Sequence, residues 1–161
     1  MTRRSLFIGV LFFLCLLGHG GAEEPGAPIS FTIEPDRTTY ATSDKVIMHL
    51  EVKNISEKPV EVVDFQQTQS LLLSAQVVSF YIEDKEGEVY LLQGPVTDYW
   101  PGDRLKSLSK GDTMETDLII NDHNGRNYYR MGRQSAYKIY ATYAGLNSRP
   151  VISNEVVITL E

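Results

Sequence analysis

Residues 97–104 of this 161-residue sequence hold the side chains best suited to binding another molecule. Tyr99 stands beside Trp100, a Pro-Gly pair that forces a turn comes next, and the segment ends at Arg104. Aromatic side chains on loops commonly bind protein partners or sugars. The competing interpretation is that Trp100 folds back and caps the open end of the core. We therefore predict a partner-binding site at Tyr99, Trp100 and Arg104.

A second candidate for binding is residues 126–133, which are locally basic within an acidic sequence. Arg126, Arg130 and Arg133 surround two tyrosines, and arginines next to aromatic rings can grip an acidic partner. Tyr129 and Met131 are instead predicted to join the core. We expect the three arginines to stay exposed, because long basic side chains keep their charged ends in water.

Catalytic and metal-binding patterns are weak in this sequence. His49 is predicted to face solvent from a strand, and His123 lies in a turn, so neither belongs to a nucleophile motif. Asn121, Asp122 and Asn124 offer hard oxygen ligands, but the distal carboxylate of a calcium loop is missing and such clusters usually form turns. We predict no enzyme activity, no cofactor and no metal.

The first 22 residues have the features of a secretory signal peptide. Arg3 and Arg4 precede an apolar run from residue 6 to 17, which is too short to span a membrane, and small residues follow it. Cleavage after Ala22 would remove Cys15, the single cysteine, so the remaining chain would contain no disulfide. The paired arginines leave open whether export follows the general or the twin-arginine route. We expect a periplasmic or extracellular protein.

Length and charge restrict the remaining possibilities. Residues 23–28 form a flexible lead-in, and residues 29–161 have the length of one domain with a core of its own. The formal net charge is −6, which disfavours binding to nucleic acid. No further segment predicts stable insertion into a membrane. We expect a protein or glycan partner.

Apolar residues alternate with polar ones in period two, which indicates strands. The sequence predicts strands at residues 29–33, 46–53, 60–65, 77–83, 88–93, 113–120, 135–143 and 156–160. Residues 54–59 are predicted to turn the second strand back onto the third as a hairpin, and this turn contains a glycosylation sequon at Asn54. Residues 84–87 are predicted to form the turn of another hairpin.

Short strands joined by turns, with no helical period, predict an all-β, immunoglobulin-like antiparallel sandwich of two sheets and 7–8 strands. A closed barrel is the alternative. The sandwich is favoured because the long irregular stretches at residues 94–105 and 121–134 suit crossings between sheets.

Several short patterns repeat those of known domains. They are Tyr40-x-x-x-Asp44-x-Val46, Asn54-x-Ser56-x-x-Pro59, Phe80-x-Ile82-x-Asp84-x-x-Gly87, Leu108-Ser-Lys-Gly111-Asp112, Tyr129-x-Met131, Tyr137-x-Ile139-x-Ala141-x-Tyr143 and Ser153-Asn154-x-Val156-x-Ile158. Together they resemble immunoglobulin-like sandwich domains of exported bacterial proteins, including the family named for a bacterial intracellular proteinase inhibitor and the macroglobulin-type β domains. The resemblance implies the fold more than an activity, because these residues build strands and turns.

The function that these observations favour is that of an exported, non-catalytic binding or accessory module that uses loops at one end of the sandwich. The alternative is a protease inhibitor that presents a loop to the protease, and an enzyme of unknown class is a third possibility. Exposed aromatic side chains would favour the binding module, whereas polar groups converging in a pocket would favour the enzyme.

Overall fold

The computed structural model describes residues 27–65, 77–92, 105–121, 131, 134–144 and 149–161. All the elements in this part of the chain are strands, as the alternating sequence predicts. They are β1 (Ile29–Pro35), β2 (Thr39–Tyr40), β3 (Ile47–Asn54), β4 (Val60–Val63), β5 (Val78–Glu83), β6 (Val89–Leu92), β7 (Leu105–Leu108), β8 (Thr113–Ile119), β9 (Ser135–Tyr143), β10 (Val151–Ile152) and β11 (Val156–Leu160).

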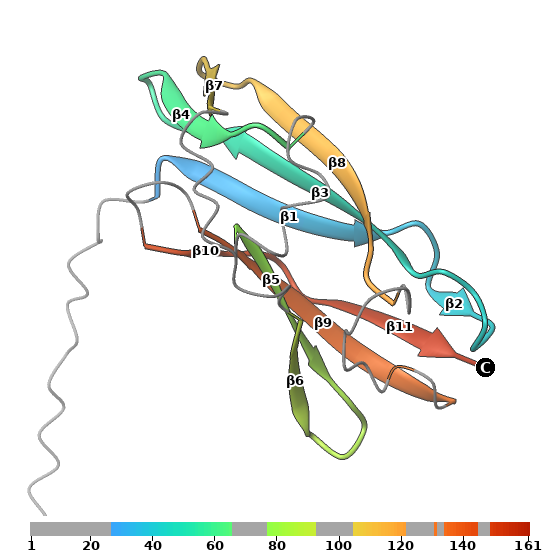
Figure 1. Cartoon of the computed structure of the whole chain (residues 1–161). Helices are drawn as coiled ribbons and strands as arrows, with labels where there is room; N and C mark the ends of the chain where they lie inside the picture. Colours follow the sequence, from blue (N-terminus) through green and yellow to red (C-terminus); the bar gives the residue numbers. More distant parts are fainter. Residues whose placement is uncertain (1–26, 66–76, 93–104, 122–130, 132–133, 145–148) are drawn as a thin grey trace, which may run out of the picture.

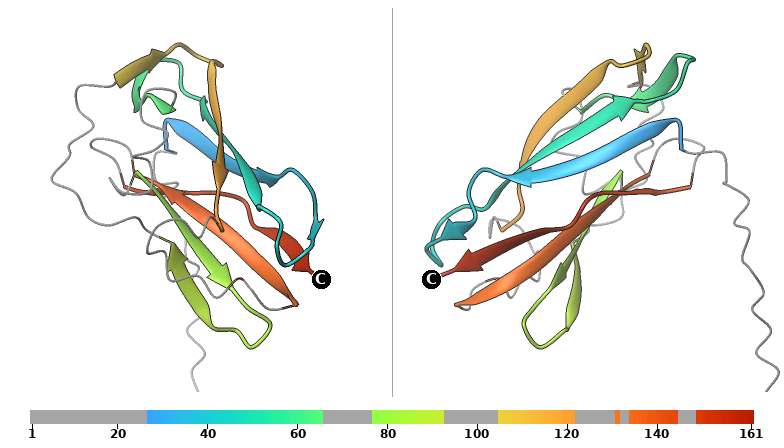
Figure 2. Two further views of the ribbon diagram at one scale, coloured as in Figure 1. Left: turned by 45° about the vertical axis from the view of Figure 1, so that its right-hand side comes forward. Right: turned by 180° about the vertical axis from the view of Figure 1, so that it is seen from behind.

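The strands form two facing layers (Figures 1 and 2). One layer is a three-stranded sheet with the order β1-β3-β8, and the other is a six-stranded sheet with the order β2-β11-β9-β5-β6, in which β10 also pairs with β9. A two-stranded sheet, β4-β7, lies beyond the end of β3 and β8. The pairs are antiparallel except for β11 with β2. The predicted all-β sandwich is confirmed.

The core lies between the layers, and the predicted inward faces supply it. In β3, Met48, Leu50 and Val52 are fully buried, while the residues between them are partly exposed. In β9 the inward set is the predicted one, with Tyr137, Ile139, Ala141 and Tyr143 all buried. The predicted hairpin at residues 84–87 also forms, between β5 and β6, and Gly87 supplies the positive φ of its turn.

The predicted hairpin between β3 and β4 is wrong. β3 pairs with β1 and β8, whereas β4 pairs with β7. The cause is Asn54, which is fully buried and whose side-chain amide donates to the carbonyl oxygens of Lys58 and Leu108, each at 2.8 Å. These two hydrogen bonds hold the turn at residues 54–59 against Leu108, at the end of β7. β3 and β4 therefore lie in different sheets, β3 beside β8 and β4 beside β7.

A similar interruption separates β10 from β11. Both pair with β9, and between them the Ser153 hydroxyl accepts a hydrogen bond from the N–H of Ala141 at 2.9 Å. The Asn154 side chain reaches across to β1, accepting from the N–H of Ile33 and donating to its carbonyl oxygen. Small polar residues thus replace ladder bonds at a bulge, and they tie the two layers together.

Tyr143 makes a second link between sheets. From the end of β9 its buried hydroxyl oxygen accepts a hydrogen bond from the N–H of Val63 in β4, at 3.0 Å. Its ring also contacts Phe31 in β1 and Phe65 just after β4, with centroids 5.7 and 5.8 Å away. The Tyr143 side chain therefore links its own sheet to the β1-β3-β8 sheet through Phe31 and to the β4-β7 sheet through Val63.

Candidate functional site

The binding residues predicted from the sequence are not placed by the structure. Tyr99, Trp100, Arg104, Arg126, Arg130 and Arg133 all lie outside the described residues. Met131, which is described, is buried in the core as predicted. The described residues include the two outer faces of the sandwich and several of its turns.

The outer face of the β1-β3-β8 sheet is polar. His49 lies at its centre, half-exposed, with Nδ1 2.8 Å from Asp117 and Nε2 3.8 Å from Glu115. Glu34 and Glu51 are the neighbours of His49 and Glu115 across the strand pairs. None of the exposed large hydrophobic side chains in the described part of the molecule belongs to β1, β3 or β8. This face is therefore a typical solvated one.

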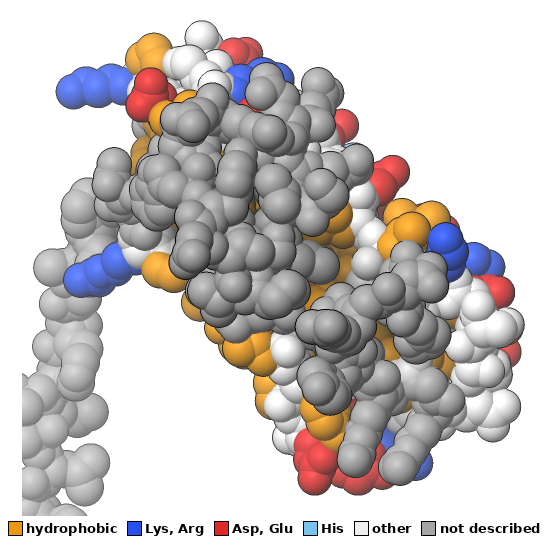
Figure 3. Space-filling view, viewed as in Figure 1, with side chains coloured by type: hydrophobic (Ala, Val, Ile, Leu, Met, Phe, Trp, Pro, Cys, Tyr) orange, Lys and Arg blue, Asp and Glu red, His pale blue; other side chains and the backbone are white. Residues whose placement is uncertain are grey.

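The outer face of the six-stranded sheet has the opposite character. Val89, Leu91, Ile152 and Val157 are 46 to 66% exposed, and they make up four of the six large hydrophobic side chains exposed in the described residues. In Figure 3, hydrophobic side chains follow the lower left margin over β10, β5 and β6 and meet acidic side chains where the β5–β6 hairpin turns. Apolar residues gathered on one face mark interaction surfaces.

Two rows of side chains cross this face. One row consists of Leu91, Tyr81 and Tyr140 on adjacent strands, and the other of Val89, Glu83, Lys138 and Val157. Leu91, Tyr81 and Tyr140 are direct neighbours, whereas the ion pair of Glu83 and Lys138 separates Val89 from Val157. The apolar and aromatic members of the two rows lie on the same face. We call them the outer patch: Tyr81, Val89, Leu91, Tyr140 and Val157.

A stacked pair of tyrosines forms the centre of the outer patch. The rings of Tyr81 and Tyr140 are parallel, with their centroids 4.8 Å apart. Beside them the Lys138 ammonium group lies 3.0 Å from Glu83 and 3.6 Å from Glu155. A hydrogen bond to Glu83 and the charges of both carboxylates raise the pKa of Lys138, so the ammonium group stays charged at neutral pH.

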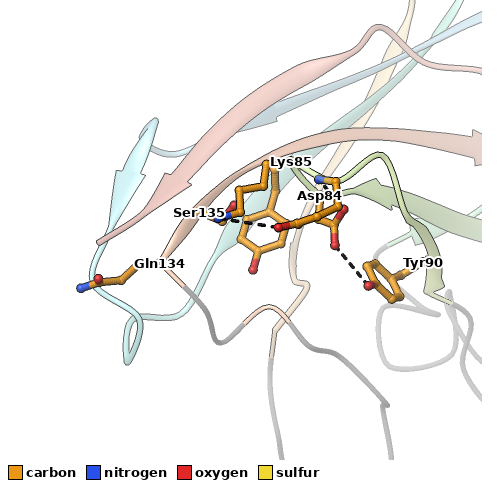
Figure 4. A pocket seen from close by; sticks show the side chains of 7 residues that line it. Asp84, Lys85, Tyr90, Gln134 and Ser135 are labelled. Atoms are coloured by element: carbon orange, nitrogen blue, oxygen red, sulfur yellow. Dashed lines mark hydrogen bonds and ion pairs between the residues drawn. The ribbon is translucent and has the colours of Figure 1, made fainter.

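The β5–β6 turn forms a cavity of about 110 Å³ at one end of the sandwich (Figure 4). Tyr90 and Asp84 line it, together with Ser135 and the buried ring of Tyr137. The Tyr90 hydroxyl lies 2.6 Å from Glu88 and 3.2 Å from Asp84, and its single proton is donated mainly to Glu88 because that contact is shorter. These hydrogen bonds and the carboxylate charges raise the pKa of Tyr90 to about 12.

Asp84 is itself bound within the turn. One carboxylate oxygen accepts the N–H groups of Glu86 and Glu88, at 3.0 and 2.9 Å. Such bonds stabilise the hairpin. In the residues that the structure describes, no group of three or more histidine, cysteine or acidic side chains could hold a metal ion. The cavity is therefore lined by groups that already take part in hydrogen bonds with one another, rather than by a metal-binding set.

Two asparagines singled out in the sequence have structural roles. Asn54, in the glycosylation sequon, is buried and uses both its amide group and its oxygen in hydrogen bonds, so a glycan cannot be attached in the folded protein. Asn121, in the potential calcium loop, accepts from the N–H of Val46 and donates to the carbonyl of Asp44, each at 2.7 Å. Asp122 and Asn124 lie outside the described residues.

The outer patch was not predicted from the sequence, although a signal was present. Consecutive apolar pairs, Leu91-Leu92 and Val156-Val157, interrupt the period-two alternation of strands that were predicted to have one apolar face. A strand that is apolar on both sides indicates that its outer side is covered or bound. Pairing of the strands was needed to bring these residues together.

No helix in the described part of the chain has the length and hydrophobicity to cross a membrane.

Comparisons with known proteins assign no family. The sequence matches no family model and no curated protein. Among solved structures, a β-glucosidase from Erythrobacter marinus is 14% identical with a TM-score of 0.43. The match covers 83% of this chain and 15% of the β-glucosidase chain. The sporulation control protein Spo0M of Bacillus subtilis is 7% identical with a TM-score of 0.45. That match covers 84% of this chain and 50% of the Spo0M chain.

A third similar structure is a CARDB domain from Pyrococcus furiosus, 10% identical with a TM-score of 0.37, covering 83% of this chain and 94% of that domain. This chain spans between 15 and 50% of the length of the first three similar structures. At these identities and TM-scores the similarities support no inference about activity or partners.

Proposed function

We propose that this protein is an exported, non-catalytic module that binds another protein through the outer patch. The observation that supports this is the difference between the two outer faces. The β1-β3-β8 face carries charged and polar side chains, whereas the six-stranded sheet exposes Val89, Leu91 and Val157 beside a tyrosine pair. Export is inferred from residues 1–22 of the sequence.

A protein partner is favoured over a glycan by the arrangement of the two tyrosines. Side chains stand roughly perpendicular to a sheet, and the parallel rings of Tyr81 and Tyr140 each use one face against the other. A flat aromatic platform for sugar rings needs open ring faces that lie side by side. Upright tyrosines among aliphatic side chains are typical of protein interfaces instead.

The loop residues predicted from the sequence remain part of this proposal. Tyr99, Trp100 and Arg104 would give the module a second contact with its partner. The resemblance to the proteinase inhibitor family would make that partner a protease, with the loop at residues 94–105 presented to it. The outer patch supports the binding module over the inhibitor, because a loop-presenting inhibitor has no need of an apolar sheet face.

The proposal can be tested by photo-crosslinking in the organism that produces the protein. A benzoylphenylalanine residue introduced at Val157 should yield one defined adduct with another protein. Leu91→Glu should abolish this adduct while leaving the melting temperature nearly unchanged, because Leu91 is 46% exposed.

Thr32→Glu is the matched control, since Thr32 is an exposed strand residue on the opposite face. It should leave the adduct intact. An adduct that is lost equally in Thr32→Glu, or that survives Leu91→Glu, would contradict binding through the outer patch.

A further inference from the structure

We infer that β6 pairs with the β6 strand of a second copy of this chain, which joins two six-stranded sheets edge to edge in a symmetric dimer. The inference concerns the edge of the sheet and not its outer face, so it does not depend on the proposed function. It follows from the direction of the backbone groups of β6, from the protective side chains that this edge lacks, and from the symmetry of its sequence.

The backbone of β6 offers hydrogen-bonding groups on the side away from β5. The N–H of Asp84 donates to the carbonyl of Glu88 at 3.0 Å, so these two opposed residues are a hydrogen-bonded pair. Because such pairs alternate along an antiparallel ladder, the N–H and C=O groups of Val89 and Leu91 point away from β5. In the part of the chain that the structure describes, β6 pairs with β5 alone and ends the sheet (Figure 1).

The other edges of the described sheets carry features that discourage pairing with another strand. Natural proteins protect an edge with charged side chains, proline or covering groups, or keep the edge strand very short. The edge strand β8 exposes Glu115 and Asp117, and the Asn154 side chain occupies the backbone groups of Ile33 at the edge of β1. β4 and β7 each contain a charged residue, and β2 and β10 have only two residues each. In contrast, β6 is Val-Tyr-Leu-Leu, with neither a charge nor a proline.

The sequence of β6 is suited to pairing with itself. In an antiparallel pair with its two-fold axis at Tyr90, Val89 of each copy lies opposite Leu91 of the other. Every outward N–H and C=O group of these residues then has a partner. On the outer face the side chains of Val89 and Leu91, which are 53 and 46% exposed in one copy, cover each other across the joint. A contact of this kind uses the same surface of both copies and closes at two chains.

The acidic turn of the β5–β6 hairpin does not oppose this pairing. In the antiparallel arrangement the two turns point to opposite ends of the joint, so their carboxylates lie apart. Glu88 lies opposite Leu92 of the second copy, which separates the two Glu88 residues by four positions, or about 13 Å, along the ladder. This distance exceeds the screening length of about 8 Å at physiological ionic strength.

The pairing also joins the outer patches of the two copies. The row of Leu91, Tyr81 and Tyr140 in one copy continues directly into Val89 of the other. The dimer therefore has one continuous sheet with both patches on the same side of it.

The inference can be tested by residue-resolved amide hydrogen exchange on the purified folded protein at a low and a high concentration. The contact is small, so the dimer should dissociate on dilution with a Kd between about 1 µM and about 1 mM. The amides of Val89 and Leu91 should be protected several-fold more strongly at the high concentration. The amides of Tyr90 and Leu92 should not change, because they bond to β5 in the single chain.

Two outcomes of the exchange experiment would overturn the inference. Protection of Val89 and Leu91 that is the same at both concentrations would show that the edge is covered within one chain. Fast exchange of both amides at both concentrations would show that the edge stays open. Sedimentation equilibrium gives the Kd of the dimer, and a single-chain mass over the whole concentration range would also exclude it.

A charged variant tests the position of the contact. Leu91→Lys places on β6 the kind of charge that protects other edges, and it should weaken the dimer Kd at least tenfold with the melting temperature nearly unchanged. Val157→Lys is the matched control, because it changes the net charge equally on the same face but on β11. It should leave the Kd unchanged. Equal weakening by the two variants would mean that charge repulsion, and not the β6 edge, controls association.

A second pair of variants tests the backbone bonds themselves. Val89→Pro removes an outward N–H group at the first residue of an edge strand, where proline is tolerated, and it should give a monomer. Val89→Thr keeps the N–H group and the branched shape, and it should still form the dimer. Full dimerisation of a folded Val89→Pro variant would contradict pairing through β6.

Discussion

At the scale of single residues, a few polar side chains determine how the sheets are joined. Asn54, Tyr143 and Asn154 each satisfy backbone groups that the strand ladders leave unpaired. Removing such a side chain costs more than the bond it makes, because a buried backbone group is left without a partner.

Tyr143 gives a testable pH dependence. Burial raises its pKa to about 12 from the value of 10.0 expected in an unfolded chain. Because the folded pKa is the higher one, the stability that this difference represents is fully present below pH 10 and is lost as the pH approaches 12. The amount is about 2 to 3 kcal/mol.

The measurement is chemical unfolding of the original protein and of Tyr143→Phe between pH 8 and pH 12. At pH 8 the original should be the more stable by about 1 to 3 kcal/mol, because the variant leaves the N–H of Val63 without its acceptor. The difference should shrink or reverse toward pH 12. Tyr140→Phe, on the outer side of the same strand, is the control for loss of a hydroxyl, and a constant difference for Tyr143→Phe would contradict the assignment.

At the scale of the elements, the register of β9 decides which side chains form the core. Ile139 is fully buried opposite Ile82 and Val156, while Lys138 points to the outer face. Ile139→Ala should therefore lower the free energy of unfolding by about 2 to 5 kcal/mol, because it leaves a cavity.

Lys138→Ala is the matched neighbour and should change stability far less, since its ion pairs with Glu83 and Glu155 are on the surface. Urea titrations of both variants give the two free energies of unfolding that are compared. Equal losses for the two substitutions would mean that the register is wrong by one residue, because a slip of one residue exchanges the two faces of a strand.

The strands themselves could be predicted from the sequence, whereas their pairing could be predicted only in part. Alternation identified the inward residues of β3 and β9, and the Gly87 turn identified the β5–β6 hairpin. The turn after β3 has equally good hairpin residues, but Asn54 bonds to Leu108, 54 positions away. A contact at such a distance has no local signature, and β2, β7 and β10 were missed for the same reason.

The same limit applies to the candidate site. Each member of the outer patch occupies a position where its strand alternation predicts an outward side chain, and nothing local shows that five such residues become neighbours. Loops attract attention in a sequence because Tyr99 and Trp100 are adjacent there. A patch assembled from four strands becomes visible only when the strand order is known.

At the scale of the whole molecule, stability should not depend on disulfides. The sequence contains one cysteine, so no bridge within the chain can form. The core between the two layers is continuous and must hold the domain by burial. Thermal unfolding with and without dithiothreitol should give the same midpoint. A decrease of several degrees on reduction would mean that Cys15 is retained and links two chains.

The position of β11 has a consequence for the protein during its synthesis. This strand, from Val156, lies between β9 and β2, and it pairs residues 159 and 160 with residues 39 and 40. Until β11 has been synthesised, the nascent six-stranded sheet lacks an interior strand, and β2 lacks the strand with which it pairs. The long edge of β9 meanwhile stays open to any other strand. The six-stranded sheet can therefore close only after residues 156–160 have been made, which makes its pairing one of the late events in folding.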